Sequence, residues 1–90
     1  MAAIKTGSFK EAVGDAAEEI YEAWEGVEET LLRNDGASRI HIGFNTDAVW
    51  DKGDYLKAGD GRVYGGRFAK ASISIISGPG LSNDVFGDRI

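Results

Sequence analysis

Acidic side chains are the most concentrated chemical feature of this sequence. All seven glutamates lie between residues 11 and 29, a stretch that also holds Asp15 and contains no lysine or arginine. Carboxylates can act as general acids or bases, hold a cation, or form an anionic surface that meets a basic partner. Six of them recur at spacings of 4, 3, 4, 3 and 4 residues, namely Glu11, Asp15, Glu18, Glu22, Glu25 and Glu29. We call this set the acidic line, because an advance of about 100° per helical residue would align it along one helix face.

The remainder of the chain carries the opposite charge. Residues 11–32 hold eight acidic and no basic side chains, whereas residues 33–90 hold eight basic and seven acidic ones. The basic residues of segment 52–70 are Lys52, Lys57, Arg62, Arg67 and Lys70. We therefore expect an electrically two-sided protein, with the acidic line and these basic residues as its protein-binding residues. The net charge of −5 disfavours non-specific binding to nucleic acid or to anionic lipid.

Catalytic and metal-binding patterns are not found in the sequence. His41 is the only histidine and there is no cysteine, so the usual ligands of a zinc site are missing. We expect His41 on the polar face of its strand. No G-x-S-x-G motif accompanies it for serine-based catalysis. The loop aspartates do not follow the spacing of a calcium-binding loop. The sequence therefore predicts a protein that is not an enzyme and that uses no cofactor or metal.

The acidic line requires a long helix to present it. Apolar residues recur with a similar rhythm on the opposite side, namely Phe9, Val13, Ala16, Ile20, Ala23, Val27 and Leu31. Ser8 and Glu11 have the spacing of a capping box, and Asn34-Asp35-Gly36 is a stop signal. These features predict one amphipathic helix over about residues 9–33, despite Gly14 and Gly26, each of which weakens a helix by about 1 kcal/mol.

Beyond the stop signal the pattern is typical of short strands. Residues 39–44 and 69–77 alternate between apolar and polar side chains, and glycine- and aspartate-rich turns lie between them. We expect a β-meander over about residues 38–77 and a short extended C-terminal tail over 78–90. The predicted fold is therefore α+β, with the long N-terminal helix packed on an antiparallel sheet of three or four strands, in a single domain of residues 1–90.

No targeting or membrane-spanning segment is recognised. The first residues, MAAIKTGS, lack the apolar run of a secretory signal. No stretch reaches the roughly 18–20 apolar residues of a membrane span. We expect a soluble, cytoplasmic protein without a membrane partner.

These features favour a non-enzymatic acidic protein-binding module, in one of two versions. In the first, a small inhibitor places its anionic helix on a basic, nucleic-acid-binding surface of a target protein. In the second, a self-assembling structural subunit sets the helix of one copy against the basic hairpin of another, as a homo-oligomer of viral or mobile-element origin. The expected partner is a protein with a basic surface or a copy of the chain itself, and nucleic acid is not an expected partner.

Two alternatives remain open at the level of sequence. A small ligand-binding protein or enzyme would use a pocket near Trp50, Tyr55 and Tyr64, and requires a concave site with at least one strongly perturbed carboxyl group. A single-stranded nucleic-acid binder would use the hairpin at 62–70, where basic and aromatic residues mix, and its affinity would fall steeply with salt.

Overall fold

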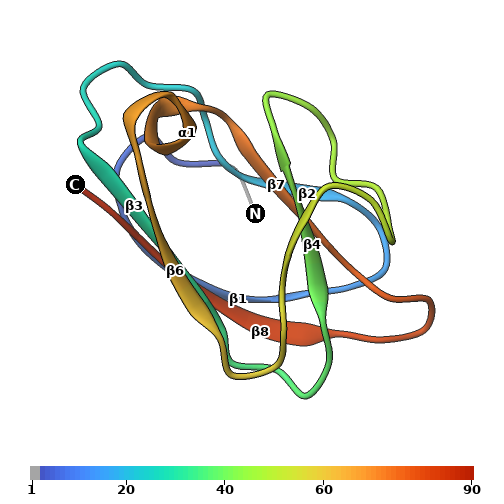
Figure 1. Ribbon diagram of the computed structural model, residues 1–90. Coiled ribbons are helices and arrows are strands. Elements are labelled where there is room, and N and C mark those ends of the chain that lie inside the picture. Colours follow the sequence, from blue (N-terminus) through green and yellow to red (C-terminus); the bar gives the residue numbers. More distant parts are fainter. Residues whose placement is uncertain (1–2) are drawn as a thin grey trace.

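Eight β-strands form nearly all of the regular structure. The computed structural model describes residues 3–90 (Figure 1). The strands are β1 (Gly7–Val13), β2 (Glu18–Tyr21), β3 (Glu29–Asn34), β4 (Ile40–Phe44), β5 (Asp54–Leu56), β6 (Gly61–Gly65), β7 (Ile73–Ser77) and β8 (Asn83–Arg89). The one helix in residues 3–90 is the five-residue α1 (Gly66–Lys70). The same residues contain no helix long and apolar enough to cross a membrane.

The strands are arranged in two four-stranded antiparallel sheets. Sheet I has the order β1-β8-β3-β6, and sheet II has the order β2-β7-β4-β5. Strand β1 pairs with β8, β2 with β7, β3 with β6 and β4 with β5, as if one long antiparallel ribbon had been rolled up. Rolling the ribbon adds the pairs β3–β8 and β4–β7, which complete the sheets. This is the strand arrangement of a jelly roll.

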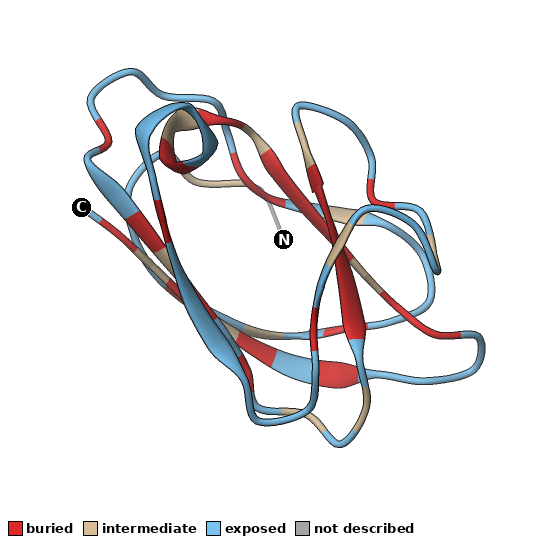
Figure 2. Ribbon diagram, viewed as in Figure 1, coloured by how far each residue is buried: buried red, intermediate tan, exposed pale blue. Residues whose placement is uncertain are grey.

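The core lies between the two sheets. Each strand sends alternate side chains inward, and Figure 2 shows the resulting alternation of buried and exposed segments along β8. Aliphatic side chains dominate the core, including Val13, Ile20, Leu32, Ile40, Ile42, Leu56, Ile73, Ile75 and Val85. Sheet II is also covered on part of its outer face, because the amide of Ala48 in the loop 45–53 donates to Ser74 Oγ at 2.9 Å.

The predicted helix over residues 9–33 is wrong. Those residues form β1, β2 and most of β3, joined by a turn at 14–17 and a loop at 22–28. Residues four apart share a face in a strand as well as in a helix, so the four-residue spacings could not distinguish the two. The three-residue spacings would distinguish a helix from a strand, but neither lies within a strand: Asp15 to Glu18 spans the turn 14–17, and Glu22 to Glu25 lies in the loop 22–28. Gly14 and Gly26 fall in these same connections, where they cost no helix stability.

The position of the glutamates also has an explanation in the sheets. Strands β1 and β2 lie at sheet edges, and they carry Glu11, Glu18 and Glu19. Charged side chains on an edge strand hinder unwanted pairing with another chain. A stretch rich in glutamate is therefore compatible with strands here, although glutamate has a low strand propensity in general.

The predicted C-terminal tail and the predicted meander are wrong as well. Residues 83–89 form β8, which lies between β1 and β3 inside sheet I. Gly87 allows this close packing, because a Cβ there would stand 2.1 Å from the ring of Phe9. The meander fails because β6 leaves its sequence neighbours and pairs with β3 in the other sheet. Both errors concern long-range pairing, which local turn and alternation signals do not specify.

Candidate functional site

The residues of the acidic line are distributed over several elements. Glu11 lies on β1, Glu18 on β2, Glu29 on β3, Asp15 in the turn 14–17, and Glu22 and Glu25 in the loop 22–28. Asp15 is used locally, since its Oδ2 accepts a hydrogen bond from the amide of Gly80 at 2.9 Å. These six residues therefore do not form the single anionic ridge that the helix would have presented.

Two members of the acidic line do come together. Glu11 and Glu18 lie on the edge strands of the two sheets, and their carboxyl groups are close enough to share a hydrogen bond. Burial, then the negative charge of Glu18, then this hydrogen bond raise the pKa of Glu11 above its ordinary value of 4.5. Glu11 Oε2 is buried without a hydrogen-bond partner. The pair can hold a proton, but neither residue lines any of three hollows, which lie beside α1, on the outer face of sheet I and beside the loop 45–53.

The basic residues of segment 52–70 also lie apart. Arg62 on β6 is held by Asp54, with Nη1 at 2.6 Å from Oδ1 and 2.8 Å from Oδ2. Tyr64 donates its hydroxyl to the same carboxylate at 2.8 Å. Burial acts to raise the pKa of Asp54, but these hydrogen bonds outweigh it and lower the pKa. The remaining positions are Lys52 in the loop 45–53, Lys57 after β5, and Arg67 and Lys70 on α1. The predicted hairpin at 62–70 is a strand followed by a helix.

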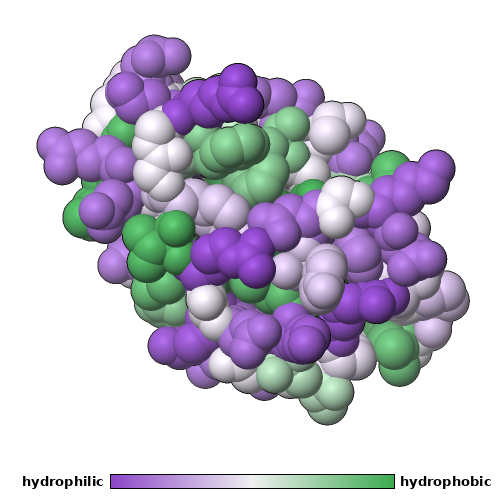
Figure 3. Space-filling model, viewed as in Figure 1, coloured by the Kyte–Doolittle hydropathy of each residue, from purple (hydrophilic) through white to green (hydrophobic). Residues whose placement is uncertain are grey.

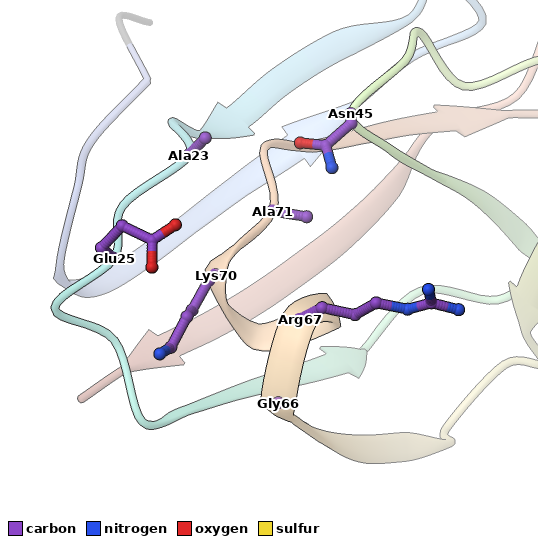
Figure 4. Close-up of a pocket in the computed structure, with 7 residues that line it drawn as sticks. All are labelled: Ala23, Glu25, Asn45, Gly66, Arg67, Lys70 and Ala71. Carbon is purple, nitrogen blue, oxygen red and sulfur yellow. The ribbon is translucent and has the colours of Figure 1, made fainter.

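One hollow lies beside α1. It measures about 440 Å³ and is lined by Ala23, Glu25, Asn45, Gly66, Arg67, Lys70 and Ala71. Figure 4 shows the side chains of Arg67 and Lys70 leaving α1 in different directions, while Glu25 places a negative charge on another wall. A small-molecule site needs polar groups that converge on one point. Residues 3–90 also contain no cluster of histidine, aspartate and glutamate that could hold a metal ion.

The aromatic residues of the alternative pocket fall into two groups. Trp50 and Tyr55 flank His41, with ring centroids 5.0 and 5.6 Å away. Tyr64 packs instead on Phe44, 5.0 Å away. His41 lies on the outer face of sheet II and is nevertheless only 4% exposed, since these rings cover it. Its Nδ1–H donates to the carbonyl of Lys52 at 2.9 Å, which leaves Nε2 buried without a partner. None of these rings lines one of the three hollows.

The outer face of sheet I carries the feature that the sequence did not predict. Four apolar side chains lie there, and we call them the outer strip: Leu31 on β3, Val63 on β6, Phe86 on β8, and Ile90 just after β8. Val63 is 58% exposed and Ile90 is 66% exposed. A hollow of about 200 Å³ runs between Leu31, Val63 and Ile90, with Glu29 and Asp88 at its border. Figure 3 shows apolar side chains gathered in the region of β3 and β6 among hydrophilic ones.

A sequence signal for this strip existed, but it was assigned to other elements. Leu31 was placed on the apolar side of the predicted helix, where it would have been core. Val63 falls within the predicted hairpin at 62–70, where the basic and aromatic residues carried the interpretation. Only the pairing of β3 with β6, which sets Leu31 opposite Val63, brings the two side chains together on one exposed face.

Comparison with known proteins gives no family for this chain. No protein-family model matches it, and no curated protein matches it significantly. The jelly-roll arrangement does not supply a function either, because capsid proteins, lectins and cupins share it. Function is therefore argued from the surfaces.

Proposed function

We propose that this protein is a non-enzymatic structural subunit that assembles with copies of itself through the outer face of sheet I. The observation that carries the proposal is the outer strip, in which Val63 and Ile90 are exposed and Leu31 and Phe86 are half-buried in the isolated chain. Exposed apolar patches with a polar border mark protein–protein contact sites. Burial of such a strip by a second copy contributes free energy of association in proportion to the apolar area removed from water.

The charges around the strip favour a copy of the same chain over a uniformly basic target. Glu29 and Asp88 lie on one part of the border. On another part, Arg33 stacks on Phe86 with its guanidinium carbon 4.8 Å from the ring centroid and pairs with Asp35 at 2.8 Å. A partner for this surface therefore needs both signs of charge, and a second copy offers them. The inhibitor version depended on closely spaced carboxylates along one helix, which these sheets do not provide.

The hollows support a binding role more than a catalytic one. The cationic side chains beside the hollow at α1 point in different directions, and the hollow on sheet I measures only about 200 Å³ and is bordered by carboxylates. A pocket enzyme requires a strongly perturbed carboxyl group in its pocket, and Glu11, the carboxyl whose pKa is raised, lies away from both hollows. A ligand-binding function for the region near Trp50 and Tyr55 has less support, because those rings pack on His41.

Sedimentation velocity over a range of concentrations tests the proposal. We expect the parent protein to form an oligomer as concentration rises, and the double variant Leu31→Asp/Ile90→Asp to dissociate with a constant at least about tenfold higher. Val49→Asp is a matched control, because Val49 is 54% exposed but lies in the loop 45–53, outside the strip. A parent protein that sediments as a monomer at every concentration contradicts the proposal.

A further inference from the structure

Strand β6 is the least protected of the four sheet edges. The edges are β1 and β6 in sheet I and β2 and β5 in sheet II. Strand β1 carries Lys10 and Glu11, β5 has only three residues, and β2 carries two glutamates and a register irregularity. Ile4 also bridges to Tyr21 at the end of β2. Strand β6 has five residues and a single charge, Arg62, which Asp54 neutralises. Proteins usually protect such edges from pairing with another chain.

The register identifies which backbone groups of β6 face this free edge. Successive residues of β3 form their backbone hydrogen bonds alternately with β8 and with β6. On the β8 side, Glu29 exchanges both backbone hydrogen bonds with Ile90, at 3.0 and 3.2 Å. Asn34 donates to the carbonyl of Asp60 at 2.8 Å on the β6 side. Thr30 and Leu32 then bond to Tyr64 and Arg62, their partners in the register. The N–H and C=O groups of residues 61, 63 and 65 consequently point outward from the sheet, and the C=O of Gly65, the N-cap residue of α1, also accepts the first hydrogen bond of that helix.

The side chains at these three positions leave the edge accessible. Gly61 and Gly65 have none, and Val63 is exposed on the outer face. The sequence G-R-V-Y-G is symmetric in its glycines about Val63. A strand with this pattern can meet an antiparallel copy of itself with glycine opposite glycine and valine opposite valine.

We propose that β6 pairs with β6 of a second copy about a two-fold axis through Val63, which joins the two copies of sheet I into one continuous sheet. This inference rests on the proposed self-assembly and adds a second contact to it, because edge pairing sets the two outer strips side by side on one continuous face without covering them. Each outward N–H at 61, 63 and 65 then meets a carbonyl of the second copy. The contact is isologous, so it closes as a dimer.

The outer faces of the two copies match in this arrangement. Leu31 lies opposite Val63 within one copy, so the row across the axis reads leucine, valine, valine, leucine. In a second row across the axis, Glu29 and Gly65 of one copy are followed by Gly61 and Arg33 of the other copy. Three strand spacings separate the Cα atoms of Glu29 and Arg33 by about 14 Å, and only glycines lie between them. Glu29 therefore faces Arg33 of the other copy across the axis, and Arg33 also pairs with Asp35 of its own copy at 2.8 Å. This charge match, together with the matched rows of Leu31 and Val63, favours pairing between copies over addition of an unrelated extended peptide.

Amide hydrogen exchange of the parent protein provides the direct test. We expect the amides of Gly61, Val63 and Gly65 to be protected at high protein concentration and to lose that protection on dilution, in parallel with dissociation measured by sedimentation. If an oligomer forms while these three amides exchange freely, β6 is not the contact. If the parent is a monomer at all concentrations, the β6 pairing and the proposed self-assembly both fail.

Two substitutions at Val63 provide the second test. Val63→Lys sets two like charges opposite each other at the axis, and Val63→Pro removes the central outward N–H without removing a bond to β3. We expect at least about a tenfold rise in the dimer dissociation constant for each, with an unchanged near-ultraviolet circular dichroism spectrum. Val49→Lys is the control. If the oligomer persists in both Val63 variants but is lost in Leu31→Asp/Ile90→Asp, the proposed function stands and the β6 pairing is overturned. The pairing is also overturned if an added unrelated peptide, and not a second copy, protects the β6 amides.

Discussion

Arg89 and Tyr21 stack in the interior, with the guanidinium carbon of Arg89 4.5 Å from the ring centroid of Tyr21. Arg89 is 1% exposed, and its Nε donates to Thr30 Oγ1 at 3.0 Å. Its other nitrogens donate to the carbonyls of Lys5, Glu22 and Ala71. These hydrogen-bond partners are all neutral, so backbone dipoles and the tyrosine ring stabilise the buried charge. One side chain of β8 thereby links the N-terminal segment, the end of β2 and the residue after α1.

Replacing Arg89 should be among the most destabilising single substitutions. Arg89→Lys keeps the charge but cannot reach these separate acceptors, so we expect a loss of about 3–5 kcal/mol in the free energy of unfolding. Urea denaturation measures it. Arg39→Lys is the matched control, because Arg39 is exposed and pairs with the exposed Asp51 at 3.1 Å. That control should change stability by less than about 1 kcal/mol, and equal losses in the two variants would refute the role of Arg89.

The Glu11 carboxyl should make stability depend on pH. Its raised pKa means that the folded state binds a proton more tightly than the unfolded state does. Ionised Glu11 therefore costs stability at neutral pH, and this cost disappears as the pH falls through the folded pKa toward the ordinary value of 4.5. We expect Glu11→Gln to raise the melting temperature at pH 7 and to match the parent near pH 4. A gain of equal size at both pH values would contradict this, and Glu19→Gln on β2 is the control.

The carboxylate of Asp54 should have the opposite pH dependence. Hydrogen bonds from Arg62 and Tyr64 lower its pKa below the ordinary value of 3.8, although burial opposes them. Its contribution is therefore fully present above the unfolded pKa and is lost as the pH falls through the folded pKa. We expect Asp54→Asn to reduce stability at pH 7, with the difference from the parent shrinking in acid. Asp51→Asn, at the exposed pair with Arg39, should show little of this effect in thermal scans between pH 2 and about 7.

Gly43 should not tolerate a side chain. A Cβ at this position of β4 would lie 2.6 Å from the carbonyl oxygen of Thr46 and 2.9 Å from the amide nitrogen of Ala48. Both atoms belong to the backbone of the loop 45–53, so Gly43→Ala must displace that loop. We expect a loss of about 1–3 kcal/mol and greater solvent exposure of Trp50, measured by denaturation and by tryptophan fluorescence. Gly14→Ala is the control, because a Cβ there meets nothing within 4 Å, and a similar loss in both would overturn this explanation.

Local strand and turn signals were predictable from the sequence, whereas the partners of the strands were not. The two alternating segments contain β4 and β7, and the turns near Gly53 and Gly59 lie where chain reversals were expected. Strand β1 was not predicted, because the apolar residues Phe9 and Val13 fit one side of an amphipathic helix when Glu11 is assigned to its polar side. In the sheet, Glu11 shares the inward face with Phe9 and Val13 and is partly buried. No local rule predicts that an acidic residue takes this position.

The candidate surface depended on those partners and was therefore missed. The charges of segment 52–70 suggested a basic hairpin, but Asp54 precedes Arg62 by eight residues and pairs with it from the other sheet. Arg89 likewise lies in the segment 78–90 that the sequence predicted as an extended C-terminal tail. Its burial depends on acceptors between 18 and 84 residues away in the sequence, which no periodicity indicates.

The pairing of Gly7 with Arg89 and of Val13 with Asn83 has a consequence for biosynthesis. Until residues 83–89 have been synthesised and have left the exit tunnel, β1 has no partner in sheet I and β3 can pair only with β6, so Phe9 and Leu32 of the nascent chain lack the cover of β8. Formation of the native domain must therefore wait for the synthesis of β8, and such long-range closure is characteristically slow.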